Sequence, residues 1–312
     1  MSQSPHPFEV AALYHFGRLP HFRDLRAPLQ SLCESHDVKG ILLVAEEGIN
    51  GTLAGPPGSM QSVIEGIKSI TGFAGLDHKM SYADAPPFLR LKVRLKVEIV
   101  TIGDTSIDPN ALVGTYVEPQ DWNALLNDPE VLLVDTRNSV EVRIGTFEGA
   151  MDPQTESFSQ FPDFVKANLD PTKHKKIAMF CTGGIRCEKA TSFMLQNGFE
   201  NVYHLKGGIL KYLETVAPDE SKWQGDCFVF DRRVALGHGL RVAEELTLCA
   251  GCRVPLTQED RESPDYEAGV CCPHCTHVLT LDKKAAARER QKQIQLSRAR
   301  GKTHMGPRSE VG

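Results

Sequence analysis

The sequence feature best suited to covalent chemistry is a short loop that combines a cysteine, two glycines and an arginine. It reads CTGGIRC from Cys181 to Cys187, and it lies between a short apolar segment and a segment with helical spacing. Catalytic groups of open α/β sheets gather where strands end. A loop that enters a helix also directs backbone N–H groups and the positive end of the helix dipole at one point. We therefore expect Cys181 to have a stabilised thiolate and to act as a nucleophile.

The other loop residues have roles that follow from their chemistry. Gly183 and Gly184 permit the positive φ angles of an inward-facing loop, and Arg186 supplies a fixed positive charge for an anionic ligand. Cys187 either resolves an oxidised Cys181 or is a buried residue of the first helical turn. The alternative to a reactive loop is a buried core cysteine followed by a flexible glycine turn. The predicted active-site loop comprises Cys181, Thr182, Gly183, Gly184, Ile185, Arg186 and Cys187.

Four further cysteines have the spacing of a metal site. Cys249 and Cys252 form one CxxC pair, Cys272 and Cys275 form another, and 19 residues separate the pairs. This spacing is typical of a zinc ribbon, in which two knuckles supply four thiolates to one ion. Exposed reduced thiols and a redox pair are the alternatives. The sequence predicts a structural zinc ion, with three spare candidate ligands: Cys271, His274 and His277.

A basic, alternating segment covers residues 89–100, which read LRLKVRLKVEIV. Strict alternation predicts a long strand with apolar side chains on one face and cations on the other. Four cations on one exposed face attract anions, so they are candidate RNA-binding residues. The alternative is an ordinary solvated sheet face. The four cations are Arg90, Lys92, Arg94 and Lys96.

The elements that position these residues fall into three predicted domains. Residues 1–118 have the order β-α-β-β-α-β: strands at 10–14, 41–45, 52–54 and 89–100, helices from about 23 and from 59, and a turn at 48–51. This order predicts a ferredoxin-like sandwich. Residues 119–221 alternate short apolar strands (131–134, 177–180, 202–205) with helices (122–126, 161–169, 188–196, 209–215). That alternation predicts a parallel α/β sheet covered on both faces.

Residues 222–312 are less regular. They contain the cysteine-rich stretch and a basic tail, of which 285–300 is a solvated helix or disordered. Residues 283–312 carry nine Lys or Arg and two Glu, a net charge of +7, so the rest of the chain sums to −12 within a total of −5. The distribution of charge, rather than its total, therefore permits an anionic partner.

Composition excludes several classes of protein. An apolar fraction of 41% argues against a largely disordered chain of 312 residues. The longest apolar runs, at 41–45 and 131–134, are too short to cross a bilayer, and the N-terminus has no secretory signal pattern. The odd number of cysteines, nine, indicates core thiols, metal ligands or catalytic groups rather than disulfides. We expect a cytoplasmic protein without membrane association.

The cysteine loop, taken with the residues that end an earlier strand, resembles a rhodanese domain. Asp135, Thr136 and Arg137 end the first predicted strand of the middle domain, and the CTGGIRC loop follows a later one. In that family the loop cysteine carries a persulfide or acts as a nucleophile. Related phosphatases have five residues between cysteine and arginine, whereas four separate Cys181 from Arg186, which resembles the sulfur-handling type. The resemblance implies that Asp135 and Arg137 support the site.

A wider, ordered set of motifs resembles the rhodanese-related tRNA uridine hydroxylases over about residues 9–280. The family implies oxygen-dependent conversion of the wobble uridine of tRNA to 5-hydroxyuridine, with O2 as co-substrate, Cys181 as catalytic residue and the tRNA anticodon loop as partner. One departure is Phe180, where many relatives have tyrosine. The motifs are EGINGT (47–52), RLKVR (90–94), DTRN (135–138), CTGGIRCEKA (181–190) and FVFD (228–231).

The chemistry of Cys181 leaves alternatives open. Addition of its thiolate to C6 of uridine would make C5 electron-rich enough to react with oxygen, whereas the other route uses a persulfide on the same residue. A sulfurtransferase that moves sulfane sulfur through Cys181 is the second function hypothesis, and a non-enzymatic RNA or protein adaptor is the third. No organic cofactor motif and no obligate protein partner is evident in the sequence.

Overall fold

A computed structural model describes residues 6–300 of the chain, which divides into two compact units, Met1–Val242 and Ala243–Gly312. In the described residues, no helix is long and apolar enough to span a membrane. The first unit contains both the N-terminal sheet and the parallel sheet with the cysteine loop. The predicted mixed α/β fold class is confirmed.

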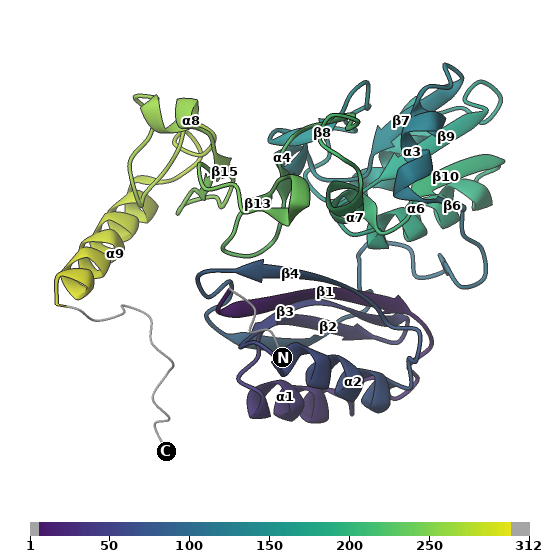
Figure 1. Cartoon of the computed structure of the whole chain (residues 1–312). Coiled ribbons are helices and arrows are strands. Elements are labelled where there is room, and N and C mark those ends of the chain that lie inside the picture. The colour runs from purple at the N-terminus through teal and green to yellow at the C-terminus, as the bar shows by residue number, and fades with distance from the viewer. Residues whose placement is uncertain (1–5, 301–312) are drawn as a thin grey trace. The chain divides into compact units, whose positions relative to one another are not determined.

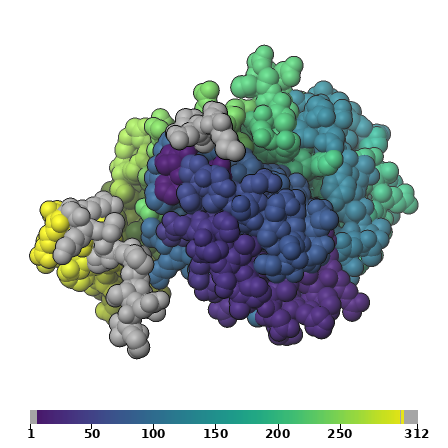
Figure 2. Space-filling model, turned by 60° about the horizontal axis from the view of Figure 1, so that its bottom comes forward, coloured from purple at the N-terminus to yellow at the C-terminus, as the bar shows by residue number. Residues whose placement is uncertain are grey.

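The N-terminal domain is a five-stranded sheet with two helices on one face (Figure 1). The sheet order is β4-β1-β3-β2-β5, and every pair is antiparallel except β2 with β5. Apolar side chains of alternate strand residues pack under α1 and α2, whose outer surface, purple to blue, is the near face in Figure 2. The elements are β1 (Phe8–Phe16), α1 (Arg26–Ser35), β2 (Lys39–Ala45), β3 (Gly48–Gly55), α2 (Ser59–Thr71), β4 (Asp77–Ala83) and β5 (Leu91–Leu95).

The ferredoxin-like order is confirmed, but the strand that completes it is not the one predicted. The last strand of the β-α-β-β-α-β order is β4, a segment in which no element was predicted. The predicted long strand at 89–100 is instead a short fifth strand, β5, at the edge. Its alternation breaks after Leu95, because Val97 is exposed and Glu98 is buried. Glu98 turns inward, where its carboxylate accepts the N–H groups of Ile102 and Gly103.

The predicted turn at 48–51 is wrong as well, since these residues begin β3. The turn lies at Glu46 and Glu47. The glycines here serve close strand packing: a Cβ on Gly51 would lie 2.3 Å from the carbonyl oxygen of Ile41 on β2. A Cβ on Gly48 would lie 2.1 Å from the carbonyl oxygen of His15 on β1. Glycine in a strand marks such a close backbone approach as readily as it marks a turn.

The central domain has the predicted parallel sheet, of order β6-β10-β9-β7. Alternate residues of β9 separate two cores: Ile177 and Met179 pack with α5 and α6, whereas Ala178 and Phe180 pack with α3 and α7. The elements are β6 (Thr115–Val117), α3 (Pro119–Leu126), β7 (Val131–Asp135), α4 (Ser139–Val142), β8 (Gly145–Phe147), α5 (Phe161–Asn168), β9 (Lys176–Phe180), α6 (Ile185–Gln196), β10 (Asn201–Leu205) and α7 (Gly208–Thr215).

The domain boundaries at 118/119 and 221/222 stay predictions. The first strand of the parallel sheet, β6, lies before residue 119. Beyond residue 221, β11 (Trp223–Gly225) pairs with β8, and β12 (Cys227–Phe228) pairs with β13 (Ala235–Leu236). These short strands bring the segment 229–240 into the same unit as both sheets.

The second unit has little regular structure apart from one long helix. Its elements are β14 (Thr247–Leu248), β15 (Pro255–Leu256), α8 (Gln258–Glu262) and α9 (Leu281–Ala299). Of the two alternatives for residues 285–300, the helix is what the structure contains, since α9 covers 285–299. The helix is mostly exposed, and the basic residues Lys302 and Arg308 of the predicted tail lie outside the described residues.

Candidate active site

The cysteine loop lies at the carboxyl end of β9 and runs into α6. Helix α6 begins at Ile185, earlier than predicted, because Gly184 ends the loop with a φ of +105°. Gly183 does not adopt a positive φ, so that part of the prediction is wrong, and a Cβ there would have nothing within 4 Å. The carbonyl groups of Cys181 and Thr182 accept the N–H groups of Ile209 and Leu210 at the start of α7. The loop is therefore held by β9 and α6 along the chain and by the hydrogen bonds from α7.

Cys181 is fully buried, yet its surroundings favour the thiolate. The N–H of Gly184 donates to its Sγ at 3.1 Å. Burial opposes ionisation, but the Cys187 thiol, the Arg186 charge and the N–H groups of Cys187 and Gly184 together lower the pKa of Cys181 to about 5. A thiol with such a pKa is almost fully ionised at neutral pH.

Cys187 is fully buried in the first turn of α6, as one of the two hypotheses expected. Burial and the neighbouring Cys181 thiolate raise the pKa of Cys187 well above its usual value. Its Sγ also lies 3.5 Å from Oγ1 of Thr136. Cys187 is therefore protonated and donates a hydrogen bond to Cys181. Of the two cysteines, Cys187 is the thiol and Cys181 is the thiolate.

Arg186 does not present an unpaired charge. Its guanidinium forms a two-pronged ion pair with Glu141, with Nη1–Oε2 at 2.6 Å and Nη2–Oε1 at 2.7 Å. Thr182 also donates to this carboxylate. Glu141 is fully buried, and despite that burial Arg186 keeps the pKa of Glu141 below its usual value. Glu141 is not among the predicted site residues, although the capping box that it forms with Asn138 at the start of α4 is a readable sequence signal.

Asp135 and Arg137 form a second buried ion pair beneath the loop. Arg137 Nη2 donates to Asp135 Oδ2 at 2.6 Å and to the carbonyl oxygen of Gly145 at 2.6 Å. Its Nη1 reaches the carbonyl oxygen of Glu141 at 3.3 Å. The pair therefore connects the end of β7 to β8 and to the residue that holds Arg186. Neither residue lines the cavity described next.

A cavity of about 430 Å³ lies between the loop and the helix-free face of the N-terminal sheet. Cys181 and Thr182 line it from the central domain, and Tyr14 and Asn50 line it from β1 and β3. The segment 229–240 supplies a third wall, in which Phe230 keeps 62% of its surface exposed. Its volume suits a single nucleoside-sized ligand. No sequence pattern predicted this cavity, because its walls come from distant parts of the chain.

Buried ion pairs hold the N-terminal sheet against the central domain. Lys189 of α6 is fully buried and lies 2.7 Å from Glu47 and 2.5 Å from Glu98. Arg233 pairs with Asp231 and donates to Ser81 Oγ of β4 at 2.7 Å. The motif residues Glu47 and Asp231 are thus packing contacts that shape the cavity.

The four predicted RNA-binding cations are all exposed, and among the described residues none forms a salt bridge. Lys92 pairs in register with Ile41, and Arg94 with Leu43, which lines the cavity. Both therefore project from the helix-free face, as the alternation predicted. Lys96 lines the cavity itself, as does Lys79 of β4. Arg90 precedes the strand.

Comparisons with known proteins cover nearly the whole chain. The model of the UPF0176 acylphosphatase-like domain matches residues 8–99, and that of the rhodanese-like domain matches residues 118–215. A tRNA uridine(34) hydroxylase of Rhizobium etli is 56% identical over 96% of this chain and 97% of its own. One of Sinorhizobium fredii is 57% identical over 96% of this chain and 95% of its own. The chain belongs to the tRNA uridine(34) hydroxylase family.

The resemblance stated from the motifs is thereby confirmed. Among solved structures, a rhodanese-related protein from Thermoplasma volcanium is 23% identical and covers 33% of this chain and 95% of its own, with a TM-score of 0.28. That match covers a third of this chain, whereas the two hydroxylase relatives cover 96% of it.

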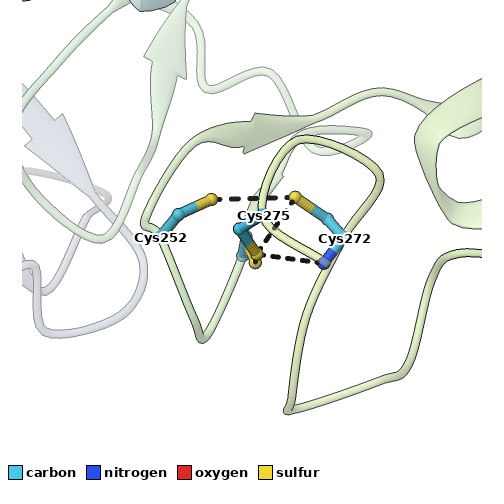
Figure 3. Close-up of side chains that lie close together, drawn as sticks. Cys252, Cys272 and Cys275 are labelled. Atoms are coloured by element: carbon cyan, nitrogen blue, oxygen red, sulfur yellow. Dashed lines mark hydrogen bonds between the residues drawn. The ribbon is translucent and has the colours of Figure 1, made fainter. Parts of the chain in front are cut away.

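The second unit of this family member brings the four predicted metal-ligating cysteines together. Figure 3 shows three of them, Cys252, Cys272 and Cys275. Their sulfur atoms all lie within 4.8 Å of one another. Three measured separations, Cys249–Cys275, Cys252–Cys272 and Cys272–Cys275, are 3.8, 3.7 and 3.8 Å. Four sulfurs at about 2.3 Å from a tetrahedral zinc ion lie about 3.8 Å apart, so the set fits zinc.

The spare candidate ligands lie outside this cluster. Cys271 Sγ contacts the carbonyl oxygen of Asp265 at 3.7 Å. His274 bonds to Asp260 at 2.6 Å, and His277 is exposed near Asp265. The CxxC spacing therefore predicted the four cysteines that form the cluster, and their binding of a metal stays a prediction.

Proposed function

We propose that this chain converts the wobble uridine of tRNA, position 34, to 5-hydroxyuridine with O2 in the cavity above Cys181. The observation that carries the proposal is a cysteine with a pKa of about 5 that lines a nucleoside-sized cavity, in a member of the tRNA uridine(34) hydroxylase family. Because a tRNA-modifying enzyme acts where its substrate is, we place it in the cytoplasm.

Cys181 is proposed to act by addition to the uracil ring. The thiolate forms a bond to C6, and the electron pair of the C5=C6 bond moves onto C5 and O4. The resulting enolate is the electron-rich species that reacts with O2 at C5. One oxygen atom stays on C5 and the other leaves as water, which requires two electrons from an external reductant. Loss of the C5 hydrogen as a proton and departure of the thiolate from C6 then restore the C5=C6 bond.

RNA binding is proposed for the basic helix-free face of the N-terminal sheet. Lys79 and Lys96 lie at the cavity, and Arg90, Lys92 and Arg94 continue the positive surface along its edge. Phosphates of an anticodon loop would contact these cations. The wobble base lies in a single-stranded loop, so its entry into a cavity costs little unpairing energy.

A structural zinc ion is proposed for Cys249, Cys252, Cys272 and Cys275. The unit around them has only a small core, to which three of these cysteines contribute, so a metal would supply much of its stability. We expect about one zinc per chain by elemental mass spectrometry, and less than about a fifth of that in Cys252→Ser. Cys271→Ser is the matched control and is expected to keep its zinc. Equal zinc in both variants would contradict the assignment.

The function is tested with tRNA that lacks the modification. Purified protein, a reductant and this tRNA are incubated under ¹⁸O2, and the nucleosides are analysed by mass spectrometry. We expect ¹⁸O-labelled 5-hydroxyuridine with the wild type and none with Cys181→Ala. Intact-protein mass and a thiosulfate–cyanide assay examine the alternative: a persulfide of about +32 Da on Cys181 with cyanide turnover and no hydroxyuridine would establish a sulfurtransferase instead.

A further inference from the structure

A tyrosine of the N-terminal sheet reaches into the cysteine site of the central domain. The hydroxyl of Tyr14, on β1, donates to Oε1 of Glu188, on α6, at 2.8 Å. Tyr14 also lines the cavity together with Cys181. A Cβ on Gly184 would lie only 2.8 Å from the Tyr14 hydroxyl, so the phenol closely approaches the turn that holds Cys181. The reaction steps described above leave this pair without a role.

We propose that Tyr14 donates a hydrogen bond to O4 of the uracil ring bound above Cys181, and that Glu188 is the positioning residue that directs this proton. The inference rests on the proposed function, since it assigns a residue to the same site. It makes the N-terminal domain part of the catalytic machinery as well as a surface for RNA.

The chemistry of the addition step calls for such a donor. When the Cys181 Sγ–C6 bond forms and the C5=C6 π bond breaks, negative charge develops on O4. A donor already aimed at that oxygen stabilises the charge without reorganisation. The same charge develops whether the attacking sulfur is a thiolate or a persulfide, so Tyr14 serves both routes.

The proton state of Glu188 controls where the Tyr14 proton points, because a phenol has one O–H. An ionised Glu188 holds that proton, as in the geometry of the Tyr14–Glu188 bond. A protonated Glu188 donates its own proton to the Tyr14 oxygen, and the phenol O–H is then available to the cavity. The protonated carboxyl is therefore the active form.

The groups that face Glu188 come from four elements. They are Tyr14 of β1, Lys79 of β4, Tyr116 of β6 and Cys181 of the loop. Burial and the Cys181 thiolate raise the pKa of Glu188 by more than the two tyrosines and Lys79 lower it, so the net shift is upward. Burial and Glu188 also raise the pKa of Tyr14 well above its usual value, so the phenol keeps its proton.

Two variants separate a catalytic role from a structural one. Tyr14→Phe keeps the ring and removes the donor, and we expect kcat to fall about 100-fold with the KM for tRNA changed less than about twofold.

Glu188→Gln keeps an N–H donor toward Tyr14 but cannot ionise. Wild-type kcat should fall as pH rises through the pKa of Glu188, and Glu188→Gln should lack this alkaline decline. Tyr82→Phe, at an exposed tyrosine of β4 that does not line the cavity, is the control.

The possible results decide the proposal. Wild-type kcat in Tyr14→Phe, or a wild-type pH profile in Glu188→Gln, would overturn it while leaving the proposed function in place. A wild type that forms no hydroxyuridine would overturn both. If Tyr14→Phe fails to fold, as judged by its melting temperature, the pH profile of Glu188→Gln decides alone.

Discussion

Ionisation distinguishes Cys181 from the other buried thiols of the first unit. Burial raises the pKa of Cys33 to about 11 and that of Cys227 to about 12, because no cationic or N–H donor outweighs the loss of water. Cys181 is equally buried, but the loop supplies a thiol donor, two N–H donors and a guanidinium. Reactivity at this site is therefore a property of the loop rather than of cysteine itself.

The first prediction concerns this ionisation. Because the thiolate is the nucleophile, alkylation of Cys181 by iodoacetamide should speed up as pH rises, with a midpoint near pH 5. Cys187→Ala removes the thiol donor and should move the midpoint upward. Peptide mass spectrometry over a pH series measures both. A wild-type midpoint near 8.5, that of an ordinary cysteine, would contradict the prediction.

The second prediction concerns the buried pair of Glu141 and Arg186. Glu141→Gln leaves a buried guanidinium without its carboxylate, so the free energy of unfolding should fall by about 3–5 kcal/mol. Urea unfolding measures this change. Glu130→Gln is the control, because Glu130 pairs with Lys176 at a side chain that is 71% exposed, and its loss should cost about 1 kcal/mol or less. Equal losses in the two variants would show that burial of the pair contributes little.

At the scale of elements, the site depends on the junction where α7 meets the cysteine loop. Gly208 begins α7 with a φ of +67°, and a Cβ there would lie 2.5 Å from the carbonyl oxygen of Cys181 and 2.7 Å from that of Thr182. These carbonyls accept the N–H groups of the next two residues. The start of α7 and the loop therefore have to form together.

The third prediction follows from this junction. Gly208→Ala combines a strained φ with contact against backbone, so the free energy of unfolding should fall by more than about 2 kcal/mol. Gly183→Ala, in the same loop, meets nothing within 4 Å at its Cβ and should change stability by less than about 1 kcal/mol. Thermal and urea unfolding measure both variants. A loss in Gly183→Ala as large as that in Gly208→Ala would contradict the prediction.

At the scale of the whole molecule, exposed positive charge lies on the same sheet face as the cavity. Lys92 and Arg94 project from the helix-free face that also carries the cavity. Lys173 and Lys175 precede β9, so they lie at the amino-terminal end of this strand, whereas the cysteine loop follows its carboxyl-terminal end. Both pairs are exposed and carry two positive charges, and Lys173 also forms a surface ion pair with Asp170.

The fourth prediction compares these pairs by charge reversal. Lys92→Glu with Arg94→Glu should weaken tRNA binding at least about tenfold and lower the slope of log Kd against log salt by roughly 1.5. Lys173→Glu with Lys175→Glu makes the same change in net charge and should leave Kd within about twofold. Filter binding over a salt series measures both. Equal weakening would mean that net charge, rather than the basic face, controls affinity.

Local pattern predicted those features that depend on neighbours in the chain. Ile177 to Phe180 form a buried strand, the glycines after it form the loop, and Arg186 lies in the first turn of the following helix, because strand, turn and helix propensities are local. The CxxC pairs predicted the four-sulfur cluster for the same reason. The segment 77–83 was missed because its sequence, DHKMSYA, has few apolar residues, and only its pairing with β1 makes it a strand.

The sequence by itself determined the buried strand and glycine loop that carry Cys181, the four cysteines that cluster, and the family of the chain. Only the tertiary structure decided that Arg186 is neutralised by Glu141, that Lys189 joins the two domains, and that Tyr14 meets Glu188 beside Cys181. The physical reason is that ion pairs and cavities arise between side chains that are distant in sequence. Their partners are selected by how the sheets pack, and no local pattern records that choice.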